Sequence, residues 1–254
     1  MNKKTNKGFT LMETVVALGI AAVALSFFVA AFAPASLGIK KAGSVQEAKL
    51  LASALEAELN TFRQGSQDSA YGSSFEKAFN WIQFDSSNLT GDYIIAFRYR
   101  ADATLAATDG VIPGYTGSFT NSLAQPMVIQ NRVTTRDYAT GNGTPTNSNA
   151  AALPIDSIEG DLFIVELTQL VHDNTGATTV LNVSADTTSV QSVDDATGNL
   201  APVTVFNNFL EPTLLVEAKF YKLESNSSRF LQNLTAAQFA ASQLVYTTKF
   251  GIMR

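Results

Sequence analysis

The hydrophobic pattern of the chain is dominated by one long apolar run near its start. Residues 14–39 include no charged side chain. As a helix with a rise of about 1.5 Å per residue, this run is about 39 Å long, which exceeds the roughly 30 Å hydrocarbon core of a bilayer. Lys3, Lys4 and Lys7 precede it, and such charges stay on the cytoplasmic side. The pattern predicts one membrane-crossing helix with a cytoplasmic N-terminus.

Two features modify this helix. Pro34 lies inside the run, lacks an N–H group and predicts a kink or local melting around Ala30–Pro34. Beyond Lys41 the apolar residues recur every three or four positions, while charged residues occupy other faces. The members of this apolar stripe are Ala48, Leu51, Leu55, Leu59 and Phe62. We expect a second, amphipathic half that packs on a globular head and ends near Gln64, before Gly65.

The remainder of the chain has the pattern of a mainly β domain. Six segments combine apolar/polar alternation with β-branched and aromatic residues: Tyr93–Arg100, Met127–Val133, Leu162–Val171, Thr178–Val183, Thr213–Tyr221 and Leu244–Ile252. The predicted fold class is therefore α+β, in which a long N-terminal helix packs on an antiparallel β-sheet head.

Smaller features of the head can also be predicted. Val171–Val180 is typical of a hairpin with its turn at Asp173–Gly176. Leu234–Ser242 favours a short helix, and we expect the Phe75–Trp81 cluster to cover an edge of the core. Two segments of low complexity predict exposed loops, namely Thr140–Ala152 and Ser184–Asn199.

Charge and composition exclude several classes of function. The net charge is −5, and without the first eight residues the chain has 14 basic and 22 acidic side chains. A body of this sign repels phosphate backbones, so we expect no nucleic-acid partner. The chain has no cysteine, which excludes disulfides, thiolate metal sites and cysteine nucleophiles.

A motif precedes the apolar run. Residues 7–16 read Lys-Gly-Phe-Thr-Leu-Met-Glu-Thr-Val-Val. This segment resembles the prepilin signature of type IV pilins and type II secretion pseudopilins. The shared features are a basic leader, a Gly–Phe junction, a glutamate at the fifth position when Phe9 is counted as the first, and an uncharged run. The resemblance implies cleavage between Gly8 and Phe9, N-methylation of Phe9, and an assembly role for Glu13. Met12 departs from the Ile, Leu or Val that the family often has there.

Two other interpretations compete for this segment. Ala31-Phe32-Ala33 resembles the cleavage site of a secretory signal peptide, but Pro34 follows it directly. A plain membrane anchor fits the length but leaves Glu13 unexplained, and a carboxylate that enters a membrane is costly. The prepilin interpretation explains Glu13, because the new α-amino group of Phe9, on its own chain or a neighbour, can pair with it and set register. The simpler alternative is that Glu13 reaches the membrane interface.

The resemblance covers about the first 40 residues and implies a leader (1–8) and a hydrophobic transmembrane and assembly helix (9–39). The hydrophobic pattern adds an amphipathic half (40–64) and a mainly β head (65–254). The resemblance also implies the partners: a prepilin peptidase/N-methyltransferase, other pilin or pseudopilin subunits, and the bacterial inner membrane. The protein would cross that membrane once, with its head outside the cytoplasm, and then enter a filament. The large head favours a minor pilin or pseudopilin. The alternatives are a tip-located binding module and a conventionally secreted or anchored β protein.

Candidate chemistry in the head is sparse. His172 is the single histidine, and Ser74 and Lys77 match a Ser-x-x-Lys pattern without its companion motifs. We therefore expect no enzyme and no resident cofactor. Some pseudopilins hold calcium in a loop, and the oxygens for such a site here would come from Asp186, Asp194 and Asp195. Their spacing is not that of an EF-hand, and we favour solvated loop acids.

Overall fold

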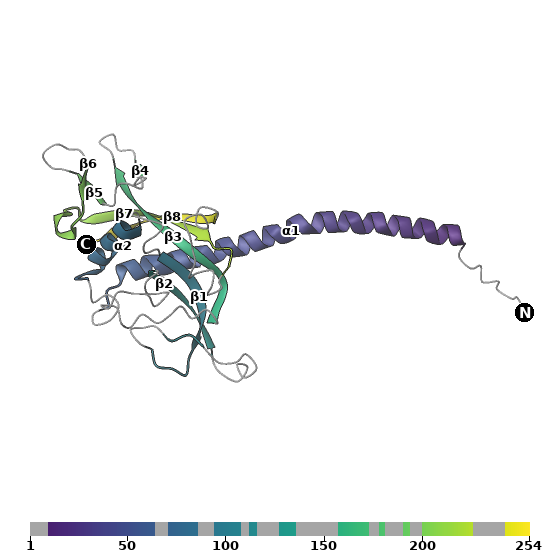
Figure 1. Cartoon of the computed structure of the whole chain (residues 1–254), viewed down its shortest axis with the longest axis horizontal. Coiled ribbons are helices and arrows are strands. Elements are labelled where there is room, and N and C mark those ends of the chain that lie inside the picture. Colours follow the sequence, from purple (N-terminus) through teal and green to yellow (C-terminus); the bar gives the residue numbers. More distant parts are fainter. Residues whose placement is uncertain are drawn as a thin grey trace, which may run out of the picture. The chain divides into compact units, whose positions relative to one another are not determined.

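The computed structural model describes most of the chain and divides it into two compact units, Met1–Gly43 and Ser44–Arg254. The described residues are 10–63, 71–85, 94–107, 112–115, 127–135, 157–172, 178–180, 190–193, 200–225 and 242–254. Within these ranges the elements are a long helix, a shorter helix, a 3-10 turn and eight strands (Figure 1).

Helix α1 runs without interruption from Leu11 to Asn60 (Figure 1). The local melting expected around Ala30–Pro34 is therefore wrong. A proline removes one N–H bond and crowds the carbonyl four residues earlier, but the neighbouring turns are rich in strong helix formers. The helix also ends at Asn60, earlier than the predicted end near Gln64.

The six predicted strands are all present. One antiparallel sheet has the order β2-β1-β3-β7-β8, and β4 pairs with the end of β3. The bounds are β1 Ile94–Asp102, β2 Met127–Thr135, β3 Ile158–His172, β4 Thr178–Val180, β7 Thr213–Lys222 and β8 Gln243–Met253. The antiparallel pairing of His172 with Thr178 confirms the predicted hairpin, whose turn lies outside the described residues.

The main core lies between one face of this sheet and the helices. The stripe residues Ala48, Leu51, Leu55 and Leu59 are buried, as predicted, whereas Phe62 remains 36% exposed. They share a cluster with inward-facing residues of the sheet, which include Ile94, Ala96, Phe163, Val165, Val216, Ala218 and Phe220. A smaller cluster on β1 and β3 includes Ile95, Phe97, Leu162 and Ile164, the alternate residues of the same strands.

Helix α2, Ser74–Asp85, was missed by the sequence analysis. Its N-terminus is capped: the Glu76 N–H donates to Ser73 Oγ (3.1 Å), and the Gly72 N–H donates to Glu76 Oε2 (2.6 Å). Phe75, Phe79 and Ile82 bury one face of it. A Ser-x-x-Glu capping pattern followed by apolar residues at spacings of three and four is the signal that indicates this helix.

A second correction concerns the predicted loop Ser184–Asn199, because β5 (Val190–Val193) lies inside it and pairs with β6 (Leu200–Val203). The β3 side chain of Gln169 fixes this pair, since Gln169 Nε2 donates to the Gln191 carbonyl and the Gln191 N–H donates to Gln169 Oε1, both at 2.7 Å. The predicted loop Thr140–Ala152 and nearly all of the predicted helix Leu234–Ser242 lie outside the described residues.

Candidate assembly site

The candidate site is the first turn of α1, where Glu13 lies. Thr10 is the residue before the helix, and both its N–H and its hydroxyl donate to Glu13 Oε2 (2.9 and 3.0 Å). In return the Glu13 N–H donates to Thr10 Oγ1 (3.3 Å). This reciprocal arrangement is a capping box, and it satisfies N–H groups that the first helical turn leaves without a partner.

The capping box was not recognised from the sequence, although Thr10-Leu11-Met12-Glu13 has the required spacing. It fixes the start of the helix at Leu11, three residues after Gly8, and holds the carboxylate close to that start. Because Thr10 would remain in a chain cut between Gly8 and Phe9, this local partner of Glu13 is available before and after cleavage.

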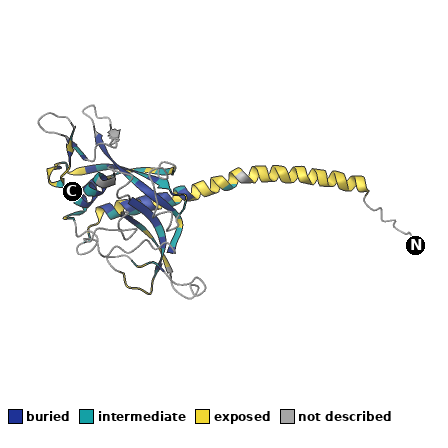
Figure 2. Ribbon diagram, in the orientation of Figure 1, coloured by how far each residue is buried: buried dark blue, intermediate teal, exposed yellow. Residues whose placement is uncertain are grey.

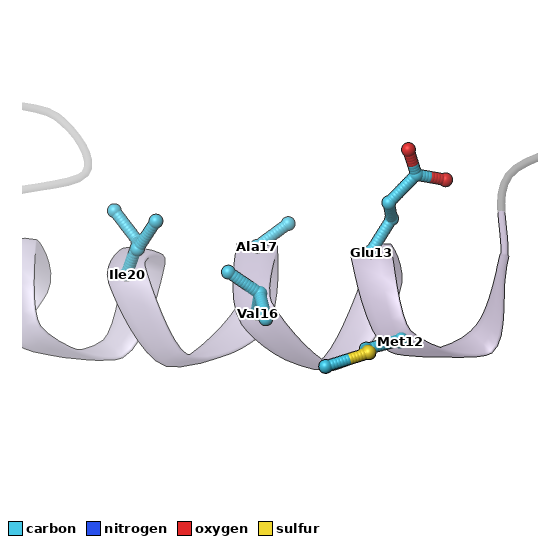
Figure 3. A pocket seen from close by; sticks show the side chains of 5 residues that line it. All are labelled: Met12, Glu13, Val16, Ala17 and Ile20. Carbon is cyan, nitrogen blue, oxygen red and sulfur yellow. The ribbon is translucent and has the colours of Figure 1, made fainter.

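Beside Glu13 the surface of the helix is hollowed. The hollow is open and is lined by Met12, Glu13, Val16, Ala17 and Ile20. Figure 3 shows the short side chain of Ala17 on the same side of the helix as Glu13, one turn further on. Residues four apart share a helix face, so a small residue at this position leaves room next to the carboxylate.

The N-terminal part of α1 that carries this hollow is exposed (Figure 2). The large apolar side chains from Leu11 to Ile39 are 52–85% exposed, and Phe28 stacks on Phe32 at 5.8 Å between ring centres. Within the described part of the chain, α1 is one helix that is long and apolar enough to cross a membrane. A water-exposed apolar surface of this length is unfavourable, so it requires lipid or other helices around it. Glu13 is the single charge on that surface.

The other predicted site residues are not brought into this arrangement. Gly8 and Phe9 lie outside the described residues, as do Asp186, Asp194 and Asp195. In the part of the chain that the structure describes, no three His, Cys, Asp or Glu side chains are grouped as they would be around a metal ion.

The Ser-x-x-Lys match has a structural explanation. Lys77 is fully buried, and its ammonium donates to the Thr61 carbonyl (2.5 Å), directly after α1, and to Glu58 Oε1 (3.3 Å). A cation at a helix C-terminus stabilises its unsatisfied carbonyls. Burial raises the pKa of the Glu58 carboxyl, but the hydrogen bond from Arg63 and the charge of Lys77 outweigh burial and hold that pKa below its usual value. Lys77 is thus a partner of the helix end.

The comparison with protein families supports the interpretation of the N-terminus. Residues 3–29 match the prokaryotic N-terminal methylation motif, which is the prepilin signal of type IV pilins and pseudopilins. The motif indicates a pilin-like structural subunit that a prepilin peptidase processes and that assembles with other pilins. The motif and the apolar helix together fit anchoring in the inner membrane. No curated protein and no solved structure matches the chain.

Proposed function

We propose that this protein is a minor pilin or pseudopilin, a structural subunit of a type IV pilus-like filament or a type II secretion pseudopilus. The observation that carries the proposal is a single carboxylate, Glu13, in an otherwise uncharged and mostly exposed stretch of helix, residues 11–39, whose start is a methylation motif. The proposed subunit consists of the leader 1–8, the transmembrane and assembly helix 9–39, the amphipathic half 40–64 and the head 65–254.

In this proposal the peptidase cuts between Gly8 and Phe9 and methylates the new N-terminus. The positive amino group of Phe9 then pairs with Glu13 of a neighbouring subunit. Within an apolar filament core an unpaired charge is costly. One ion pair at a fixed height therefore disfavours every other alignment of the two neighbouring subunits along the filament, because the charge would then be unpaired. The hollow beside Ala17 gives the incoming chain terminus space to reach the carboxylate.

The orientation follows from charge. Lys3, Lys4 and Lys7 hold the leader in the cytoplasm, where the cleavage site also lies. The head crosses to the other side and from there enters the filament. Charges on both sides of the apolar run, with Lys40 and Lys41 at its far end, limit how far the helix can slide along the membrane normal.

The experiment is to express the whole chain in a host with a prepilin peptidase and to measure the N-terminal mass from the cell envelope. A chain that begins at N-methyl-Phe9 is the expected product. A chain that begins between Pro34 and Leu37 would establish an ordinary secreted protein and refute the proposal. An uncut chain would leave a membrane anchor.

Assembly is tested separately with Glu13→Gln, and Glu56→Gln serves as the control because Glu56 is exposed on the same helix. We expect Glu13→Gln to be cleaved normally but to be lost from sheared or cross-linked filaments, while Glu56→Gln is incorporated like the wild type. Normal incorporation of Glu13→Gln would refute the assembly role of Glu13.

A further inference from the structure

The first turn of α1 within the unit Ser44–Arg254 meets the sheet at an irregular point of β3. Between β1 and β3 the register passes from Phe97 opposite Leu162 to Arg98 opposite Glu159. Gly160 and Asp161 therefore form a bulge on β3, and Gly160 has a φ of +80°, a conformation that glycine adopts without strain. The bulge removes the Asp161 N–H from the ladder with β1.

Glu47 of α1 occupies the position that this bulge creates. Its Oε2 accepts a hydrogen bond from the Asp161 N–H (3.1 Å). The carboxyl group lies directly over Gly160, so that a Cβ at that position would come within 2.2 Å of Oε1 and 2.6 Å of Oε2. The close approach thus depends on the missing side chain of residue 160.

The other oxygen of this carboxyl group is poorly satisfied. Glu47 Oε1 is buried, and it accepts no hydrogen bond from any residue that the structure describes. The side chain as a whole is only 11% exposed. A buried carboxylate oxygen without a donor carries much of the cost of removing a charge from water.

Charged groups face Glu47 from three strands. Arg98 of β1 lies 4.0 Å from Oε1, too far for a hydrogen bond. Asp161 of β3 presents a second negative charge, and its Oδ2 is 2.7 Å from the ammonium of Lys222 on β7. Ser44, one turn before Glu47, donates its hydroxyl to the same Oδ2. Asp161 thus has the close cation and the hydroxyl donor, while Glu47 accepts one backbone hydrogen bond and feels Arg98 and Lys222 only through their charge.

We propose that Glu47 is a proton-operated latch between α1 and the sheet. With a proton on Oε1 the carboxyl group is neutral, keeps its hydrogen bond from the Asp161 N–H and closes the turn Ser44–Ala48 onto β3. When the proton leaves, the Glu47 carboxylate is an incompletely paired charge between α1 and β3, and the turn Ser44–Ala48 loosens from the bulge.

The direction of the effect follows from the environment of the carboxyl group. Burial is the main reason that the pKa of Glu47 is raised above its usual value of 4.5, and the charge of Asp161 adds to it; the Asp161 N–H, Arg98 and Lys222 oppose the rise. A carboxyl group with a raised folded-state pKa contributes stability below its unfolded-state pKa, and that contribution is lost as the pH rises through the folded-state value. The latch is therefore closed in acid and weakened toward neutral pH.

The test is hydrogen exchange of the full chain in detergent micelles, followed by mass spectrometry from about pH 4 to about pH 8, with the rates corrected for intrinsic exchange. Peptides that cover Ser44–Ala48 and the bulge report the latch. We compare the wild type with Glu47→Gln, which imitates the protonated group, and with Glu56→Gln, which removes an exposed charge from the same helix.

We expect corrected exchange of both peptides in the wild type and in Glu56→Gln to become several-fold faster between acid and neutral pH. In Glu47→Gln it should stay slow throughout. The proposal is overturned if the wild type shows no such change, or if Glu47→Gln keeps the pH dependence of the wild type.

A second measurement decides the matter if Glu47→Gln does not fold. In wild-type protein labelled with ¹³C at glutamate carboxyl groups, the Glu47 signal should titrate above the ordinary glutamate range. Titration within that range would overturn the proposal. Neither result depends on cleavage at Gly8 or on filament formation, so failure of the latch and failure of the proposed function can be told apart.

Discussion

Replacement of Lys77 by methionine tests how much one buried cation stabilises the packing of α2 against the end of α1. Methionine is unbranched and fills a similar volume, so Lys77→Met removes the charge with little change in packing. The affected contacts of the ammonium include the Thr61 carbonyl at 2.5 Å, Glu58 Oε1 at 3.3 Å and the ring of Trp81 at 5.9 Å.

The magnitude can be worked from these contacts. A hydrogen bond to a charged group contributes about 1.5–3 kcal/mol, and a cation at a helix C-terminus contributes about 0.3–2 kcal/mol. Glu58 keeps Arg63 at 2.7 Å and is 15% exposed, so the roughly 3–5 kcal/mol for a fully orphaned buried charge does not apply. We expect Lys77→Met to lower the free energy of unfolding by about 2–5 kcal/mol.

The assay is urea unfolding of the full chain in detergent micelles, monitored by fluorescence. Trp81 is the single tryptophan of the chain and lies next to the perturbed group, so its emission reports this region directly. The control is Lys49→Met on the exposed side of α1, where a change within about 0.5 kcal/mol is expected.

The double variant Glu58→Gln/Lys77→Met should lose less stability than the two single variants summed, because neither partner is then left without the other. The reasoning would be refuted if Lys77→Met unfolded within about 0.5 kcal/mol of Lys49→Met, since the buried ammonium would then contribute nothing to this packing.

Three further predictions concern the helix cap at Thr10, the titration of Glu58 and the backbone at Gly160. Thr10→Ala should raise amide exchange in the first turn of α1, equivalent to about 1 kcal/mol of cap stability, while Thr10→Ser retains protection; equal exchange in both variants would contradict the capping box. The pKa of Glu58 is lowered in the folded state, so the stability that Glu58 contributes is present above pH 4.5 and is lost as the pH falls through the folded-state pKa. In urea titrations at several pH values, Glu58→Gln should abolish this acid-induced loss of stability. An unchanged pH profile of stability in Glu58→Gln would contradict the prediction. Gly160→Ala should cost about 2–4 kcal/mol, because it combines a positive φ with a clash against Glu47, whereas Gly43→Ala meets no atom within 4 Å and should be neutral or stabilising in the same unfolding assay.

Local patterns were enough to predict the apolar N-terminal helix and the six strands of the main sheet. The methylation motif, the uncharged run and the apolar stripe from Ala48 to Leu59 depend on neighbours within one or two helical turns. The alternation in segments such as Thr213–Tyr221 likewise depends on a period of two residues. Two errors were also local, because the capping patterns at Thr10 and Ser73 were present in the sequence and were overlooked.

Other features were decided by tertiary structure. The strand β5 was not predicted because it is only four residues long and lies within a stretch rich in Ser, Thr and Asp, and its backbone is held by the side chain of Gln169. Helix α1 ends at Asn60 where Lys77, a residue of another helix, binds the next carbonyl.

The amino-acid sequence by itself predicted an apolar helix long enough to cross a membrane, the position of a cleavage site and the six strands of the main sheet, since these predictions depend on the order of neighbouring side chains. Only the tertiary structure decided the roles of Glu47, Gly160 and Lys77. Glu47 and its hydrogen-bond donor Asp161 are 114 residues apart. No local period links such positions, because their contact exists only after the sheet has formed and the helix has packed on it.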